Sequence, residues 1–266
     1  MFINHNSFAT FLGMGLVLGL SLLLSSGPFG KPGPFGSANV WLMAGLTCIF
    51  AALLATQSRM GIAATFIGAL VPLTSGAYGK RNHIALMVML FAIVLIAFGQ
   101  GILERAVLIS SSLTTRIELY AQVSEMIKAR PLVGFGADTF PWAYELFHTP
   151  PVTAGFVWNK AHSTYLAFWV EYGVIFGTTP IVAGLYTAWV LIRKLRENKG
   201  PFACAALSVL ILGAAHSTVD FSLEIQANTF LFLALIALGL APKHRSTGRR
   251  RSGPSWQGLS ASKAKP

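Results

Sequence analysis

Stretches of about 20 apolar residues limit what this chain can fold into more than any other feature. A helix needs about 20 mostly apolar residues to cross the hydrocarbon core of a bilayer. One stretch, Ser163–Ile192, is too long for one straight crossing, so we expect there a helix that starts at His162 and bends near Gly173–Pro180. We therefore predict an all-α, polytopic membrane protein with about seven transmembrane helices. The seven stretches are Phe8–Leu24, Val40–Thr56, Met60–Tyr78, Ile84–Leu103, Ser163–Ile192, Pro201–Val219 and Ile225–Pro242.

The composition supports a membrane protein and argues against a nucleic-acid partner. Only 11% of the residues are charged and 54% are hydrophobic, whereas soluble domains carry about 25% charge. The net charge of +11 comes from short basic clusters at the ends of apolar stretches, where such clusters set membrane orientation. No nucleic-acid-binding motif is present. Cys48 and Cys204 lie in separate apolar stretches and predict neither a disulfide framework nor a metal site.

The loops divide the chain into four parts. The positive-inside rule places 14 of the 20 Lys and Arg residues in the cytoplasm. Residues 1–102 then carry the first four spans, and residues 103–162 form a long polar loop on the outer side. Residues 163–242 carry the last three spans, and residues 243–266 form a basic cytoplasmic tail that we expect to be disordered.

The outer loop contains a predicted helix followed by a turn. Apolar residues recur at helical spacing within Leu113–Lys128, at Leu113, Ile117, Tyr120, Val123 and Ile127. This stripe predicts an amphipathic helix that lies on the membrane surface. Pro131 should end the helix, and Gly134 and Gly136 should form a tight turn. The turn lacks the flanking strand and the Lys-Ser/Thr of a nucleotide-binding loop, so no nucleotide cofactor is indicated.

Three charged or titratable side chains on the outer side are candidates for chemistry. Arg59 lies between the second and third stretches, where it either marks the membrane boundary or binds an anion, since a guanidinium suits phosphate. Arg116 taken alone is more simply a solvated charge or one that faces lipid headgroups. His162 taken alone is more simply a polar residue at a helix start, but histidine is also the side chain best suited to accept a proton near neutral pH.

Two further pairs of polar residues have ordinary explanations. Glu118 and Glu125 share a helix face, and an exposed acidic face explains them better than a glycosidase pair. His216 and Asp220 are four residues apart near the outer end of the sixth stretch, where they could hydrogen-bond or provide two metal ligands. No third ligand stands at useful spacing, so we predict no metal.

Three segments taken together carry a resemblance. Ser58-Arg59 stands at the outer start of a helix. The run RIELYAQVSEMIKARPLVGFGADTF (Arg116–Phe140) combines an arginine, an amphipathic helix and Pro-Leu-x-Gly-x-Gly. His162-Ser163 is followed after nine residues by Gly173, and then by Gly177 and a threonine. These segments resemble the O-antigen ligase and Wzy-type polysaccharide polymerase superfamily of bacterial inner membranes. HSTVDF (His216–Phe221) is similar to another recurrent family segment. The resemblance covers roughly Val40–Leu240 and corresponds to the C-terminal part of an architecture that usually has about twelve spans.

The resemblance implies a periplasmic glycosyltransferase. The donor would be an undecaprenyl-diphosphate-linked glycan. The acceptor would be lipid A–core in a ligase or a second lipid-linked glycan in a polymerase, and the His162–Thr179 pattern favours the ligase slightly. Arg59, Arg116 and Ser163 would bind the substrate. The catalytic residues would be His162, which accepts the proton of the acceptor hydroxyl, and the two arginines, which stabilise the charge of the leaving diphosphate. The transfer would be inverting and would need neither a metal nor another cofactor.

A non-catalytic export or transport protein in contact with membrane lipids is the alternative from a different class. Transporters usually carry charged residues within their spans and contain internal repeats. Only Glu171 lies well inside a span here, and the sequence shows no repeat.

Overall fold

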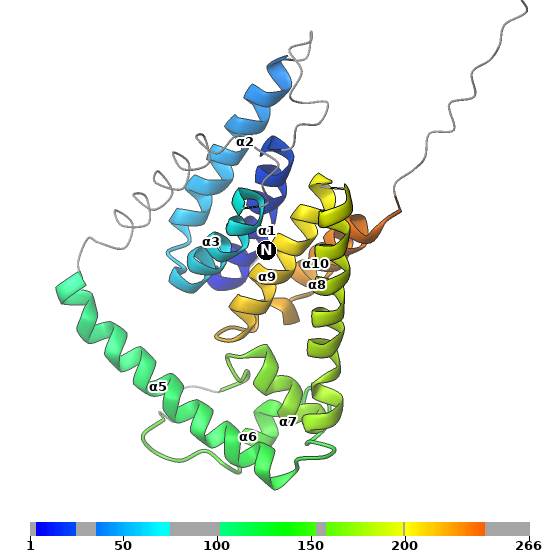
Figure 1. The fold of residues 1–266 in the computed structure, drawn as a ribbon. Coiled ribbons are helices and arrows are strands. Elements are labelled where there is room, and N and C mark those ends of the chain that lie inside the picture. Colours follow the sequence, from blue (N-terminus) through cyan, green and yellow to red (C-terminus); the bar gives the residue numbers. More distant parts are fainter. Residues whose placement is uncertain (1–3, 25–35, 75–101, 153–157, 199, 243–266) are drawn as a thin grey trace, which may run out of the picture.

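The computed structural model describes residues 4–24, 36–74, 102–152, 158–198 and 200–242 (Figure 1). These residues form helices and connecting turns with no strand among them, so the all-α prediction is confirmed. The elements are α1 (His5–Leu24), α2 (Gly36–Ala55), α3 (Arg59–Thr74), α5 (Ile102–Ala129), α6 (Phe140–Tyr144), α7 (Thr164–Gly177), α8 (Thr179–Asn198), α9 (Pro201–Ser217), the 3-10 turn η2 (Ser222–Glu224) and α10 (Gln226–Leu240).

Helix α9 is the centre of a bundle in which it contacts α1, α3, α8 and α10 (Figure 1). Its sequence PFACAALSVLILGAAHS is apolar on all sides, as expected for a helix surrounded by others, and most of its residues are buried. Small residues allow close packing. A Cβ on Gly68 of α3 would stand 2.8 Å from the Ser208 carbonyl oxygen, and one on Gly239 of α10 would stand 2.2 Å from Ala206 Cβ. Such contacts between small residues are typical of membrane helices.

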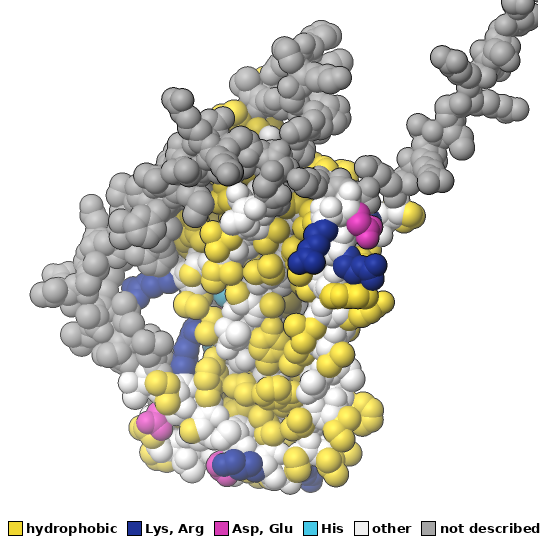
Figure 2. Space-filling model, viewed as in Figure 1, with side chains coloured by type: hydrophobic (Ala, Val, Ile, Leu, Met, Phe, Trp, Pro, Cys, Tyr) yellow, Lys and Arg dark blue, Asp and Glu magenta, His cyan; other side chains and the backbone are white. Residues whose placement is uncertain are grey.

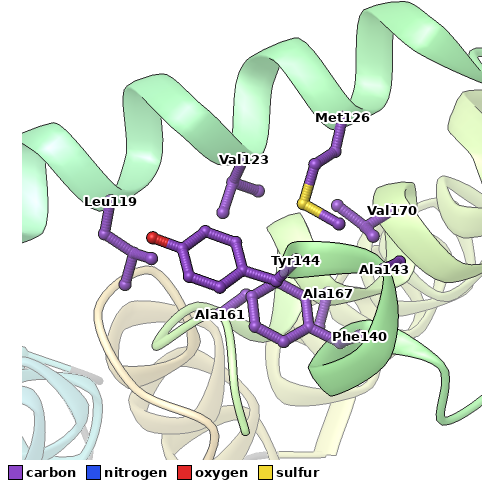
Figure 3. Packing of buried hydrophobic residues seen from close by; sticks show 9 residues of the cluster. All are labelled: Leu119, Val123, Met126, Phe140, Ala143, Tyr144, Ala161, Ala167 and Val170. Atoms are coloured by element: carbon purple, nitrogen blue, oxygen red, sulfur yellow. The ribbon is translucent and has the colours of Figure 1, made fainter. Parts of the chain in front are cut away.

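A second layer, made of α5, α6 and α7, lies beneath one end of this bundle (Figure 1). Figure 3 shows α5 side chains pointing at the ring of Tyr144 and at α7. The Tyr144 hydroxyl donates to Gln122 Oε1 at 2.6 Å, and burial raises the pKa of Tyr144 to about 12. The cluster consists of Leu119, Val123, Met126, Phe140, Ala143, Tyr144, Ala161, Ala167 and Val170.

The predicted amphipathic helix is therefore present, but two of its features were wrong. It begins at Ile102, well before the predicted start at Leu113. Its buried stripe runs through Leu119, Val123 and Met126, whereas Ile117 is 66% exposed. The buried face packs on α6 and α7, because these elements offer it an apolar protein surface.

The prediction of seven spans is not confirmed. Among the described helices, α1 alone is long and apolar enough to cross a bilayer, and α7 with α8 passes the same test only as a pair bent by 72°. The reason is length: α3, α9 and α10 have 16, 17 and 15 residues, and α9 ends at a polar turn. The predicted bend near Gly173–Pro180 is confirmed. The predicted span Ile84–Leu103 lies almost entirely outside the described residues, as does the tail from residue 243.

Two glycines fix the bend. Gly173 has φ 74° and ψ 169°, a backbone region that is essentially restricted to glycine. Val174 N–H donates to the Pro131 carbonyl at 2.7 Å, and Phe135 N–H donates to Val170 at 2.8 Å. Gly134 adopts φ +66°, as a tight turn requires. Because the N–H groups of Gly134, Phe135 and Gly136 are all bound to carbonyls of this chain, the turn does not form a phosphate loop.

Replacing Gly173 with alanine should lower the free energy of unfolding by about 2–5 kcal/mol, from backbone strain and overpacking. The new Cβ would stand 2.2 Å from the Leu132 carbonyl oxygen. Gly184→Ala is the matched control, because its Cβ would meet its nearest neighbour at 3.9 Å. Thermal unfolding in detergent measures both variants, and equal melting temperatures would contradict this account of the bend.

Candidate functional site

His162 lies directly before α7, in a backbone conformation that few residues adopt. Its φ is +52°, which is uncommon for a residue other than glycine. The next residue, Ser163, caps α7: its hydroxyl oxygen accepts from Leu166 N–H at 3.5 Å and donates to the Ser217 carbonyl at 3.2 Å. Ser163 is 3% exposed, so the structure gives its hydroxyl a structural role. This cap fixes where the helix starts and holds His162 just outside it.

Aromatic rings hold the His162 imidazole in place. The rings of Trp158 and Phe221 make edge contacts with it, at centroid distances of 5.8 and 5.5 Å. The Tyr120 hydroxyl donates to the His162 carbonyl at 2.8 Å. The ring atom Nδ1 is buried and has no hydrogen-bond partner among the described residues.

The electrostatic surroundings favour a neutral imidazole. Burial lowers the pKa of His162 below its usual value, and the nearby Arg116 guanidinium lowers it further, while Asp220 acts in the opposite direction. A neutral histidine can accept a proton near neutral pH. The arrangement therefore provides a proton acceptor beside a fixed positive charge.

Arg116 reaches the same place from α5. Its Nη1 donates to the Val219 carbonyl at 3.1 Å. Among the described residues no carboxylate forms an ion pair with it. A guanidinium has five N–H donors, so this half-buried arginine retains donors for an anion.

One short segment, the corner His216–Ser222, joins these parts. It accepts hydrogen bonds from Arg116, Ser163 and Thr164, the last at 3.2 Å from the Asp220 carbonyl. The predicted pair of His216 and Asp220 is not bonded side chain to side chain. Instead, His216 Nδ1 lies 2.6 Å from the Thr10 hydroxyl, and Asp220 accepts from Asn6 Nδ2 at 3.2 Å and from the Ser222 hydroxyl.

Arg59 stands at the first position of α3 and is exposed. Its side chain has no hydrogen bond or ion pair with a described residue, so the structure does not bring it into contact with Arg116 or His162. The connection is indirect. Ser58 Oγ donates to Asn6 Oδ1 at 2.7 Å, and Asn6 in turn donates to Asp220. Asn6 thus links the start of α3 to the corner, although it lies 214 positions from Asp220.

Replacing Asn6 with aspartate should lower the melting temperature more than replacing it with leucine, because a second carboxylate would face the buried Asp220. Leaving Asp220 short of one donor costs about 1–3 kcal/mol. Combining Asn6→Asp with Asp220→Asn restores one amide and one carboxylate and should recover stability relative to Asn6→Asp. His5→Ala, at the preceding position, which is exposed, is the control. If Asn6→Asp had the same melting temperature as His5→Ala, the hydrogen bond from Asn6 to Asp220 would not stabilise the corner.

Sequence analysis missed an ion pair that attaches the segment before His162 to η2. Lys160 Nζ lies 2.9 Å from Glu224 Oε2, and both side chains are largely buried. Burial raises the pKa of Glu224, whereas Lys160 lowers it. The pair ties the chain two residues before His162 to η2. Spacing alone could not have indicated it, because the two residues are far apart in the sequence.

Nothing in the described part of the chain suggests a metal centre: no group of three or more His, Cys, Asp and Glu residues lies close enough to hold an ion. The site consists of an unpaired arginine and a neutral histidine on one corner, with a second arginine on a helix bridged to that corner. Such a site can bind an anion and accept a proton.

A family model described as O-antigen ligase matches residues 38–179, more than half of the chain. The chain belongs to the O-antigen ligase family. No curated protein matches it. The matched part contains Arg59, Arg116 and His162, while Asn6 and the corner lie outside it. This is a family of membrane proteins, and its description supports glycan transfer of the ligase or polymerase kind.

Proposed function

We propose that this O-antigen ligase family member transfers glycan from an undecaprenyl-diphosphate-linked donor to an acceptor hydroxyl. The transfer takes place at the periplasmic face of the bacterial inner membrane, and the C-terminus is cytoplasmic. The observation that carries the proposal is that Arg116 and His162 meet at one corner, bonded to Val219 and in ring contact with Phe221, respectively. The diphosphate of the donor is the anion that the site needs, and the acceptor hydroxyl supplies the proton.

His162 acts as the general base. The imidazole takes the proton of the acceptor hydroxyl while the hydroxyl oxygen bonds to the anomeric carbon of the donor sugar. The bond from that carbon to the diphosphate oxygen breaks, and its electron pair stays on the diphosphate. Attack from the opposite face inverts the configuration. Because Nδ1 is buried, we assign proton transfer to Nε2.

Arg116 and Arg59 bind the diphosphate and stabilise the charge that develops on it as it leaves. Positive groups positioned where charge develops are among the strongest contributions to catalysis. The two guanidinium groups then serve where many glycosyltransferases use a divalent cation. Ser163 contributes through the cap of α7, which positions His162.

Transfer by the purified protein tests the proposal. The donor is an undecaprenyl-diphosphate-linked glycan, and the acceptor is either lipid A–core or a second lipid-linked glycan. We expect glycan on lipid A–core, in keeping with the His162–Thr179 pattern and the family description. Lengthening of the lipid-linked glycan alone would identify a Wzy-type polymerase. Transfer to neither acceptor would overturn the proposal in favour of a non-catalytic role in polysaccharide export.

A further inference from the structure

An exposed apolar surface lies where α7 meets α8, far from His162 along α7. We call it the elbow and define it by four side chains, Leu132 and Val133 of the turn after α5 and Ile175 and Phe176 at the end of α7. Each is between 61% and 70% exposed. Figure 2 shows hydrophobic side chains around this lower end of α8.

The elbow continues into one face of α8. Val182, Leu185, Tyr186 and Trp189 are all at least half exposed and recur at helical spacing. A shallow groove of about 480 Å³ joins the two surfaces and is lined by Ile175, Thr178, Thr179, Val182, Ala183 and Tyr186. No charged residue occurs from Gly173 to Ile192. The uncharged surface ends at Arg193, whose guanidinium lies 5.0 Å from the ring centroid of Trp189.

The uncharged part of α8 is shorter than the hydrocarbon core of a bilayer is thick. From Thr179 to Ile192 the helix rises about 21 Å at about 1.5 Å per residue, whereas the hydrocarbon core of a bilayer is about 30 Å thick. Helix α7 is bent from α8 by 72°, so it adds little height along α8. The elbow lies beyond the N-terminal end of α8 and supplies apolar surface for the rest of the hydrocarbon thickness.

The polar groups at the bend are suited to a site without water. In hydrocarbon, backbone and hydroxyl groups must find partners within the protein. The Thr178 hydroxyl donates to the Val174 carbonyl at 2.5 Å, and the Thr179 hydroxyl donates to the Phe176 carbonyl at 2.6 Å. Val174 N–H, freed by the break at Gly173, donates to Pro131 at 2.7 Å.

We propose that the elbow inserts into the hydrocarbon of the bilayer leaflet on the same side as His162, with lipid acyl chains as its partner. Helix α7 then runs along the membrane surface from the elbow to His162 and does not complete a crossing with α8. The kink at Gly173 inside α7 and the break between α7 and α8 together set this angle, and hydrogen bonds hold the turn Leu132–Phe135 against α7 at the kink. The catalytic corner is thereby held at the height of the lipid headgroups.

Spin labels test the depth of the elbow without any measurement of glycan transfer. Single cysteines replace Val133 and Phe176, Leu185 on α8 as the lipid-facing reference, and Glu145, which is exposed, as the aqueous reference. Cys48→Ser and Cys204→Ala remove the native thiols. The labelled proteins are placed in vesicles of phosphatidylethanolamine and phosphatidylglycerol. Collision rates are then measured with oxygen, which concentrates in hydrocarbon, and with a water-soluble nickel chelate.

We expect the labels at positions 133 and 176 to resemble the one at position 185, with oxygen favoured over the nickel chelate at least fivefold more than at position 145. Labels at 133 and 176 that resemble position 145 would place the elbow in water and overturn the proposal. Labels that neither reagent reaches would mean that protein covers the elbow, such as a second copy of this chain, and would overturn it equally. Because the elbow side chains are exposed, these substitutions should not disturb folding.

Discussion

Replacing His162 with alanine or asparagine is expected to lower glycan transfer by at least about 100-fold, since a positioned general base contributes about 10²–10⁴-fold. Neither side chain can take the acceptor proton. Asparagine is the more informative variant, because it tolerates the positive φ that this position requires and so separates loss of the base from strain in the backbone. Initial rates of transfer by purified protein measure the effect.

His5→Ala and His148→Ala control for the loss of a histidine as such. His5 is exposed, and His148 Nε2 is 3.0 Å from the Val152 carbonyl, away from the corner. Both should leave transfer within about twofold of the wild type. A His162→Asn protein with normal melting temperature and undiminished transfer would refute the assignment of the base.

The sequence predicted the features that depend on local pattern. Apolar length predicted helices, the helical spacing within Leu113–Lys128 predicted α5, and the glycines predicted the bend between α7 and α8. It also selected Arg116 and His162, which the structure brings to one corner. The choice rested on residue type, on their position in the outer loop and on the family resemblance.

What sequence reasoning missed depends on contacts between distant segments. The face of α5 was misjudged because periodicity identifies an apolar stripe but not whether protein or lipid covers it. Asn6 stood just before the predicted first span with no local pattern to distinguish it, and its importance comes from Ser58 and Asp220, which are distant in the sequence. The length of α9 was overestimated because apolar residues continue past Ser217, where a polar turn ends the helix.

Arg116→Ala should reduce transfer by about 10²–10³-fold, the range found when one group that stabilises developing charge is removed. The leaving diphosphate loses a cation, and α5 loses its bond to the Val219 carbonyl. Arg116→Lys should recover part of the activity, because it keeps the charge but not the forked geometry. Lys128→Ala, which removes a cation from an exposed ion pair on the same helix, is the control and should have little effect.

The pH profile of transfer distinguishes an electrostatic effect of Arg116 on His162 from a purely structural role of Arg116. Burial and the charge of Arg116 both lower the pKa of His162, so wild-type transfer should persist as the pH falls below about 6.5, the usual histidine pKa. Arg116→Gln removes the second of these causes, so the pKa of His162 should rise. The acid limb of its residual activity should therefore move to higher pH, while Arg116→Lys keeps the wild-type limb. An unchanged limb in Arg116→Gln would mean that the guanidinium does not act on His162, and Arg116 would then be left with the diphosphate alone.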